Sequence, residues 1–383
     1  MNRGLPIAAA ILMLVVLLPM SRKPTEASQA SSVELRPAWN RTMEARITDI
    51  RLSSTGRCVG ISTDENIVVI DPTGRELWRW DFRKDNRFAF STKIAVSPNC
   101  DWAAFVGGQG YHYVWFVLQR GTRNFVKTEG TPLTVDIDHA GKSVAIGTGA
   151  GFVLMYTPEG ALKWKLDVGG PLPIQEIAFA DDDRAIMVSS YGQAIVSAEG
   201  KRFPFTGMWG VGSMRAASDF KTFVAWGQPP HGPGIGKVSL LDGGGKEIWS
   251  RVATNPRAII SPAGDRIVVE TNDNQFPSEA DHFSPQSEEL PRALRLLSRT
   301  GDVVRTYREH GNPIAFFSDG RSFVLHQTDG FLALDLNENP LWKISKSGLP
   351  LIASTTNLMS VVVAQENRLE WYSPPPRPGS TGR

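Results

Sequence analysis

The chain has 383 residues, 41% of them hydrophobic and 21% charged, which is the composition of a globular protein with an extended core. Its formal net charge is +2, and the charged residues among the first thirty (Arg3, Arg22, Lys23 and Glu26) account for that excess. The remainder is neutral and lacks the basic footprint that nucleic acid requires, so we exclude nucleic acid as a partner.

An unbroken apolar run occupies residues 4–20 behind a single arginine. Such a run predicts a signal peptide or a short N-terminal membrane anchor within residues 1–30. Ser28 and Ala30 supply the small residues of a cleavage site before Ser31. Basic residues directly after the run leave cleavage and topology open. We expect an exported protein, periplasmic or extracellular, that is either released or tethered to the membrane by residues 4–20.

A glycine followed four positions later by an aromatic residue recurs along the chain. The copies end at Trp78, Phe125, Trp164 and Trp249, and a looser copy ends at Trp342. Successive tryptophans lie 85 to 93 residues apart, close to two units of roughly 43 residues. A four-stranded propeller blade needs roughly 40–45 residues.

Short β-rich runs separated by turn residues fill each unit, and units begin at Ile47, Lys93, Leu133, Gln175, Gly212, Arg257 and Pro313. The fourth is irregular because Pro204 takes the aromatic position. A final unit at residues 350–372 has only three strands, and the segment around Trp39 is expected to supply the fourth and close the ring.

We therefore predict an all-β fold: one β-propeller domain over residues 31–373, built of four-stranded antiparallel blades and closed by an N-terminal strand. The prediction is eight blades, or seven if the fourth unit merges with a neighbour. Residues 374–383 are rich in proline and are expected to form a disordered tail.

The recurring aromatic residues have a structural interpretation, because a large ring on each blade buries apolar area against the next sheet. We assign this packing role to Trp39, Trp78, Phe125, Trp164, Trp249 and Trp342. Cys58 and Cys100 lie near equivalent turns of neighbouring units. A disulfide and a pair of free buried thiols are both compatible with the sequence.

The Gly-x-x-x-Trp endings, one of them preceded by Asp71-Pro-Thr-Gly74, resemble the tryptophan-docking repeats of PQQ-like (quinoprotein-like) propellers. The turn Ser261-Pro-Ala-Gly264 is similar to those of WD-repeat and TolB-like propellers. The resemblance covers residues 33–373. It implies either a quinoprotein oxidoreductase that holds PQQ with Ca²⁺ on the ring axis, or a non-catalytic exported propeller similar to the assembly lipoprotein BamB. The adjacent cysteine pair of the enzymes and the lipobox cysteine of BamB are both missing here.

The longest connections between second and third strands are residues 227–236 and 271–292. In a four-stranded blade such loops share a face with the connections between blades, and propellers place function on loops of this kind. We select five residues there as ligand-binding candidates: Trp209, Trp226, His231, Phe276 and His282. The sequence contains no HExxH, GxSxG or P-loop motif, so we predict no catalytic residue and no metal ligand.

These observations predict an exported, monomeric propeller that acts as a binding or scaffold module for a protein or polymer partner and needs no cofactor. The alternative is a PQQ-dependent oxidoreductase with Ca²⁺, or another propeller enzyme with its site on the axis. Acids and amides that converge on the axis from several blades would favour the enzyme. An apolar or aromatic patch among the loops would favour the scaffold.

Overall fold

The computed structural model describes the chain from residue 32 to residue 374 with internal gaps. The described ranges are 32–82, 91–109, 112–119, 122–168, 173–179, 183, 185–189, 194–202, 211–218, 221–228, 235–272, 292–346, 350–354 and 360–374. Residues 1–30, where the signal peptide or anchor is predicted, and tail residues 375–383 lie outside these ranges. Among the described residues, no helix has the length and hydropathy needed to cross a membrane.

The described residues form a succession of antiparallel sheets, and six of these are regular four-stranded blades. Five take their strands consecutively from the chain: β3 (Ile47–Leu52), β4 (Val59–Thr63), β5 (Asn66–Ile70) and β6 (Glu76–Asp81); β7 (Ser91–Val96), β8 (Trp102–Gln109), β9 (His112–Gln119) and β10 (Thr122–Lys127); β11 (Pro132–Ile137), β12 (Val144–Thr148), β13 (Phe152–Tyr156) and β14 (Leu162–Asp167); β18 (Val211–Ala216), β19 (Thr222–Gln228), β20 (Ile235–Asp242) and β21 (Glu247–Thr254); β22 (Arg257–Ile260), β23 (Arg266–Thr271), β24 (Ala293–Ser298) and β25 (Val303–Tyr307).

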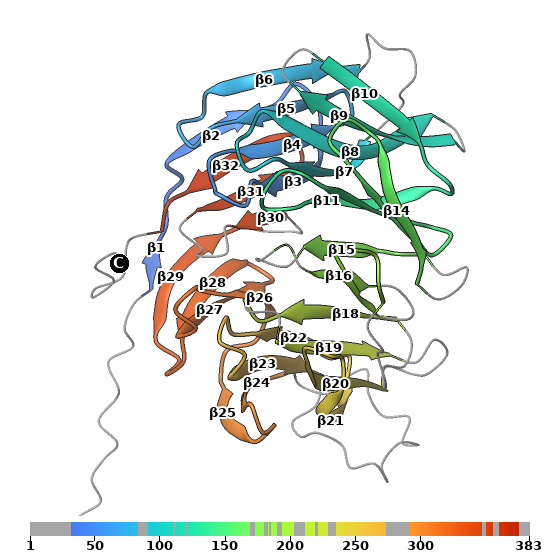
Figure 1. Ribbon diagram of the computed structural model, residues 1–383. Coiled ribbons are helices and arrows are strands. Elements are labelled where there is room, and N and C mark those ends of the chain that lie inside the picture. Colours follow the sequence, from blue (N-terminus) through green and yellow to red (C-terminus); the bar gives the residue numbers. More distant parts are fainter. Residues whose placement is uncertain are drawn as a thin grey trace, which may run out of the picture. The chain divides into compact units, whose positions relative to one another are not determined.

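The sixth regular blade joins the two ends of the chain. It consists of β2 (Trp39–Thr42), β30 (Leu351–Ser354), β31 (Val361–Gln365) and β32 (Arg368–Tyr372). As predicted, the N-terminal strand around Trp39 pairs antiparallel with the last strand, Trp39 opposite Trp371. Figure 1 shows β2 beside β32 although they come from opposite ends of the sequence. This pairing covers an edge that would otherwise be open.

The predicted count of eight or seven four-stranded blades is wrong, because two sheets depart from four strands. One has three strands, β15 (Glu176–Phe179), β16 (Ala185–Ser189) and β17 (Ala194–Ser197). After β17 the chain makes one isolated bridge, Val196 to Arg202, and Pro204, which has no N–H to donate, lies outside the described residues.

The other irregular sheet has five strands: β1 (Val33–Glu34), β26 (Asn312–Phe316), β27 (Ser322–Gln327), β28 (Gly330–Asp335) and β29 (Pro340–Ser345). The extra strand is β1, which adds in parallel to the outer edge of β29. Such a two-residue strand has no hydrophobic periodicity that a sequence could reveal.

The core lies between neighbouring sheets rather than at a single centre. For example, Ile61 and Val68 of one sheet pack with Val362 and Trp371 of another. Middle strands such as β4 and β5 are buried throughout because both faces of their sheet are covered. Contacts of β3 with both β7 and β30 show that the series of sheets closes on itself. The fold is therefore an all-β β-propeller.

The recurring tryptophans join adjacent sheets by the same contact. Indole Nε1 donates a hydrogen bond to a turn carbonyl of the next sheet: Trp39 to Pro72 (2.8 Å), Trp78 to Cys100 (2.8 Å), Trp164 to Ala198 (2.8 Å) and Trp249 to Arg299 (2.9 Å). In three of these turns the ring lies against a glycine with positive φ: Gly74, Gly200 and Gly301. A Cβ at Gly200 would stand 2.9 Å from the Trp164 ring, so the turn needs glycine for two reasons.

Of the other assigned aromatic residues, Trp342 is 2% exposed in the cluster between its sheet and the next, and Phe125 lies in β10. Cys58 and Cys100 form a disulfide with a Cα–Cα distance of 6.1 Å. Both cysteines are buried in the cluster between the first two regular blades. The bond therefore links two adjacent blades covalently.

Replacing both cysteines by alanine should destabilise the protein, because the bond closes a loop of 42 residues and so restricts the unfolded chain. Loop entropy predicts a loss of about 4 kcal/mol in the free energy of unfolding. Denaturant titration would measure it. Dithiothreitol should lower the free energy of unfolding of the native protein to that of the variant Cys58→Ala/Cys100→Ala. It should leave the free energy of unfolding of the variant unchanged. A native protein insensitive to reductant would contradict the prediction.

Candidate functional site

Four of the five predicted binding residues (Trp209, His231, Phe276 and His282) lie outside the described part of the chain. The fifth, Trp226, lies within strand β19 rather than in a loop. Its half-buried ring packs against the core between two blades. The guanidinium carbon of Arg215 stands 5.7 Å from the ring centroid. In this position Trp226 stabilises the blade, and its contacts are with the protein itself.

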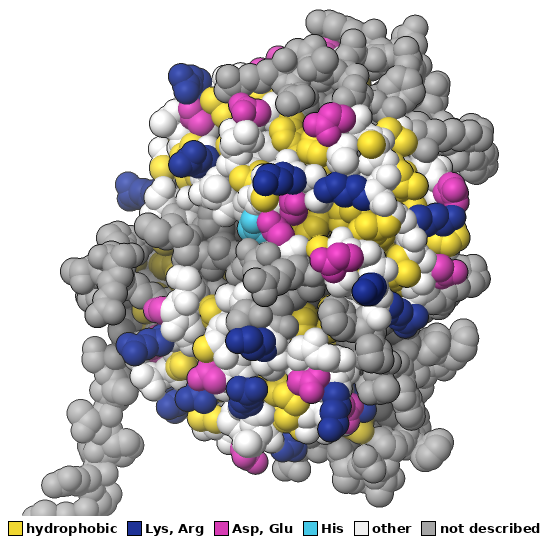
Figure 2. All heavy atoms as spheres, in the orientation of Figure 1, with side chains coloured by type: hydrophobic (Ala, Val, Ile, Leu, Met, Phe, Trp, Pro, Cys, Tyr) yellow, Lys and Arg dark blue, Asp and Glu magenta, His cyan; other side chains and the backbone are white. Residues whose placement is uncertain are grey.

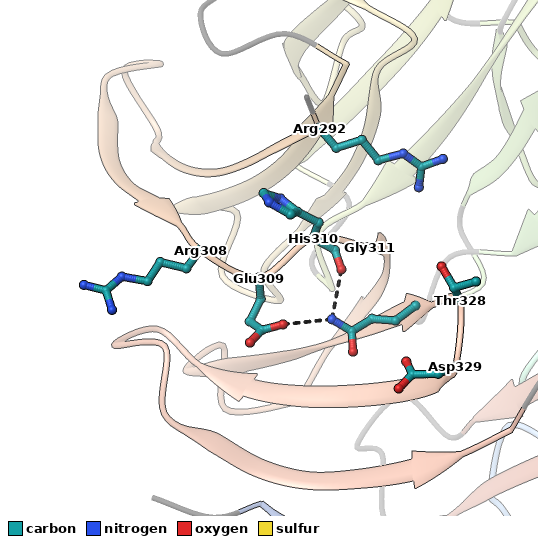
Figure 3. Close-up of a pocket in the computed structure, with 8 residues that line it drawn as sticks. Arg292, Arg308, Glu309, His310, Gly311, Thr328 and Asp329 are labelled. Atoms are coloured by element: carbon teal, nitrogen blue, oxygen red, sulfur yellow. Dashed lines mark hydrogen bonds between the residues drawn. The ribbon is translucent and has the colours of Figure 1, made fainter. Parts of the chain in front are cut away.

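A cleft of about 410 Å³ lies where three connections meet. The first is the long connection between β23 and β24, which ends at Arg292. The second is the link between blades at residues 308–311, and the third is the β27–β28 turn with residues 327–329 (Figure 3). Connections between second and third strands and connections between blades thus border one cleft. We call it the loop-face cleft.

Acidic and amide groups of the loop-face cleft are held by the protein. The Gln327 side-chain amide donates to Glu309 Oε2 and to the His310 carbonyl, both at 3.0 Å (dashed in Figure 3). Lys343 Nζ lies 2.5 Å from Asp329 Oδ2, and this hydrogen bond lowers the pKa of Asp329. No hydrogen bond or ion pair within the described residues engages the Arg308 guanidinium, which is exposed.

The buried carboxylate of Glu270 lies behind the cleft. Glu270 is 3% exposed, accepts a hydrogen bond from the Gly311 N–H, and lies 3.5 Å from the Arg292 guanidinium. Burial raises the pKa of Glu270, and the charges of Arg292 and Arg257 oppose this shift. A Cβ on residue 311 would stand 2.8 Å from the His326 carbonyl oxygen, so this position in the link between blades must be glycine.

Next to Gln327, the His326 ring stacks on Phe331 at a centroid distance of 5.0 Å. Burial, with a contribution from Arg257, lowers the pKa of His326. Its Nε2 is buried and has no hydrogen-bond partner within the described residues. Sequence reasoning missed Glu270, His326 and the cleft, because no motif spacing links residues from three separate connections.

Exposed apolar side chains do not gather at the cleft. The large ones in the described part are Val33 on β1, Leu162 on β14, Ile248 on β21, and Val303 and Val304 on β25. Figure 2 shows basic and acidic side chains interspersed on the face in view. In the part of the chain that the structure describes, the groups at the loop-face cleft are therefore mainly polar.

A PQQ–Ca²⁺ centre would lie on the axis of the ring, which the inner strands surround. Carboxylates of the inner strands are already bonded between blades. Asp49 Oδ2 accepts the Ile94 N–H at 3.0 Å, Asp136 Oδ2 accepts the Phe179 N–H at 2.9 Å, and Glu176 lies 3.0 Å from the Arg215 guanidinium. No three His, Cys, Asp or Glu side chains in the described residues are grouped as a metal site. The described residues do not fit a Ca²⁺–PQQ centre.

Fold and cleft together define a β-propeller with polar connections on one face. No protein-family model and no curated protein sequence matches this chain. Many solved structures share its fold. A chain of Kuenenia stuttgartiensis hydrazine synthase is similar with a TM-score of 0.52 and 13% sequence identity, over 87% of this chain and 97% of that one. Identity this low establishes the fold alone.

Glu270→Gln should stabilise the protein at neutral pH. Because burial raises the pKa of Glu270, the native state keeps a proton that the unfolded chain loses near pH 4.5. The free energy of unfolding therefore falls as the pH rises through the native pKa. Glutamine keeps an acceptor for the Gly311 N–H and has no charge to bury.

Urea titrations of both proteins between pH 4 and pH 8 should give a stability difference that grows with pH. Asp329→Asn is the matched control, since the native pKa of Asp329 is lowered and its replacement should not raise stability at neutral pH. A constant difference between Glu270→Gln and the native protein over this range would contradict the account.

Proposed function

We propose that this protein is an exported β-propeller binding module that holds a partner protein or an extended polymer at the loop-face cleft. One observation carries the proposal: three separate connections build the cleft on a closed ring of sheets. Ends of the connections are fixed by strands on either side. A partner that binds there meets groups that are already ordered, so little conformational entropy is lost on binding.

The charges of the cleft indicate the chemistry of the partner. Glu309 and Asp329 are engaged by Gln327 and Lys343. Arg308 exposes its guanidinium, and Arg292 is also exposed although it lies 3.5 Å from Glu270. Guanidinium groups bind carboxylates and phosphates in a forked geometry. The partner we propose therefore presents acidic groups to this face.

Two observations support export. The apolar run at residues 4–20 has the length and flanking charge of an export signal. The Cys58–Cys100 disulfide joins two blades, and structural disulfides persist in oxidising compartments.

Site-specific photocross-linking in living cells tests the binding role. A photoreactive residue at Thr328, in the cleft, should cross-link a partner, and Arg308→Glu should reduce the yield severalfold by reversing a charge that meets the partner. The control position is Arg305, which is exposed on the outer strand β25. Equal yields from positions 328 and 305, or a yield that Arg308→Glu leaves unchanged, would refute the proposal.

Thiol alkylation tests export separately. The full chain, denatured without reductant, should show no free thiol because Cys58 and Cys100 are paired. A variant without residues 1–30 should stay in the reducing cytosol and show two. The number of free thiols is read from the increase in mass after treatment with a maleimide–polyethylene glycol. Two free thiols in the full chain would contradict export.

A further inference from the structure

The inner strands of successive blades place polar side chains at equivalent positions. In six sheets a tight turn follows the inner strand and opens at Ser53, Ser97, Asp138, Ala217, Ser261 and Phe317. Four residues before the first five of these lie the polar residues Asp49, Lys93, Thr134, Ser213 and Arg257, and before the sixth lies Pro313. The same strands also carry buried apolar side chains, such as Ile50, Ile94 and Ile259.

A pocket of about 260 Å³ opens among these residues. It is lined by Arg51 and Lys93 from two inner strands, Thr134 and Ser213 from two others, and Gln175 with Glu176 at the start of β15. Five consecutive inner strands thus contribute to one pocket, which we call the axial pocket. Its volume is below the roughly 300–1,000 Å³ of a site for a drug-sized ligand, so it limits the ligand to a small molecule.

Arg51 is the cation of this pocket that makes no ion pair or hydrogen bond through its side chain with another residue in the described ranges. Lys93 Nζ lies 3.3 Å from Asp49, and Arg215, beside the pocket, is held by Glu176 at 3.0 Å. Within the described residues no hydrogen bond or ion pair engages the exposed Arg51 guanidinium. The charge of Arg51 acts on the partly buried carboxyl of Asp136, which accepts the Phe179 N–H at 2.9 Å.

The remaining groups of the pocket select among anions. Thr134 and Ser213 offer hydroxyls, Gln175 offers an amide, and Glu176 offers a carboxylate that only accepts hydrogen bonds from hydroxyls or amines. A doubly charged phosphate would be repelled by Glu176. A molecule with a single carboxylate and several hydroxyls would bind Arg51 and Lys93 through its carboxylate, and its hydroxyls would donate hydrogen bonds to Glu176.

We propose that the axial pocket binds a small polyhydroxy carboxylate of monosaccharide size, such as a hexuronate, with its carboxylate on Arg51. The pocket is separate from the loop-face cleft and uses none of its residues. The inference therefore stands independently of the proposed partner-binding role.

Calorimetric titration of the purified full chain with sodium D-glucuronate tests the proposal, with D-glucose and inorganic phosphate as comparison ligands at equal ionic strength. Glucuronate should bind at least about tenfold more tightly than either, because only glucuronate combines a single carboxylate with hydroxyls. Absence of glucuronate binding, or tighter binding of phosphate or glucose, would overturn it. These comparisons need no variant.

Variants locate the site. Arg51→Gln should weaken glucuronate binding roughly tenfold to a hundredfold, as expected for loss of a charged hydrogen bond. It should leave the melting temperature unchanged, since Arg51 holds no other described side chain. Arg305→Gln on the outer strand β25 is the matched control and should bind as the native protein does. Equal affinities of Arg51→Gln and Arg305→Gln would also overturn the assignment.

Discussion

The contact on which this ring depends is an indole that donates a hydrogen bond to the turn of the next sheet while its ring covers a glycine. Trp39, Trp164 and Trp249 each meet a turn in this way. In the motif that runs from Gly74 to Trp78, the glycine receives Trp39 from one neighbouring sheet, and Trp78 itself reaches Cys100 of the other. One short motif therefore serves two interfaces. Because the glycine has positive φ and no Cβ, both the turn and the close approach of the ring depend on it.

The inner strands add a second set of links, which has a consequence for function. Asp49 and Asp136 accept backbone N–H groups of the next blade, and Glu176 holds Arg215. These carboxylates stabilise the ring, since each accepts a hydrogen bond from a group of the neighbouring sheet. In the two pockets, the cations whose guanidinium groups make no hydrogen bond or ion pair with the described residues are Arg51 and Arg308, and the proposals for anionic ligands rest on these two groups.

How far the sequence predicts this structure depends on whether a feature repeats. Positions of Trp78, Trp164 and Trp249 are periodic because the same interface recurs, and the strand around Trp39 could be placed because it keeps that period. The predicted number of four strands per sheet was wrong where the periodicity of the sequence ends. β1 is two residues long and adds in parallel to β29, and the sheet of β15–β17 has three strands, so neither follows the repeat. Trp226, one of the predicted ligand-binding residues, lies in strand β19, which extends through it to Gln228.

The sequence by itself determined the all-β repeat architecture, the closure of the ring by an N-terminal strand and the neutral composition of the main body, since local patterns of apolar, turn and charged residues encode them. Only the tertiary structure decided that Cys58 pairs with Cys100 and that Arg51, Lys93, Thr134 and Glu176 meet in one pocket. A propeller collects such a site one residue at a time from successive blades. No spacing along the chain marks these residues as neighbours until the sheets have packed around the axis.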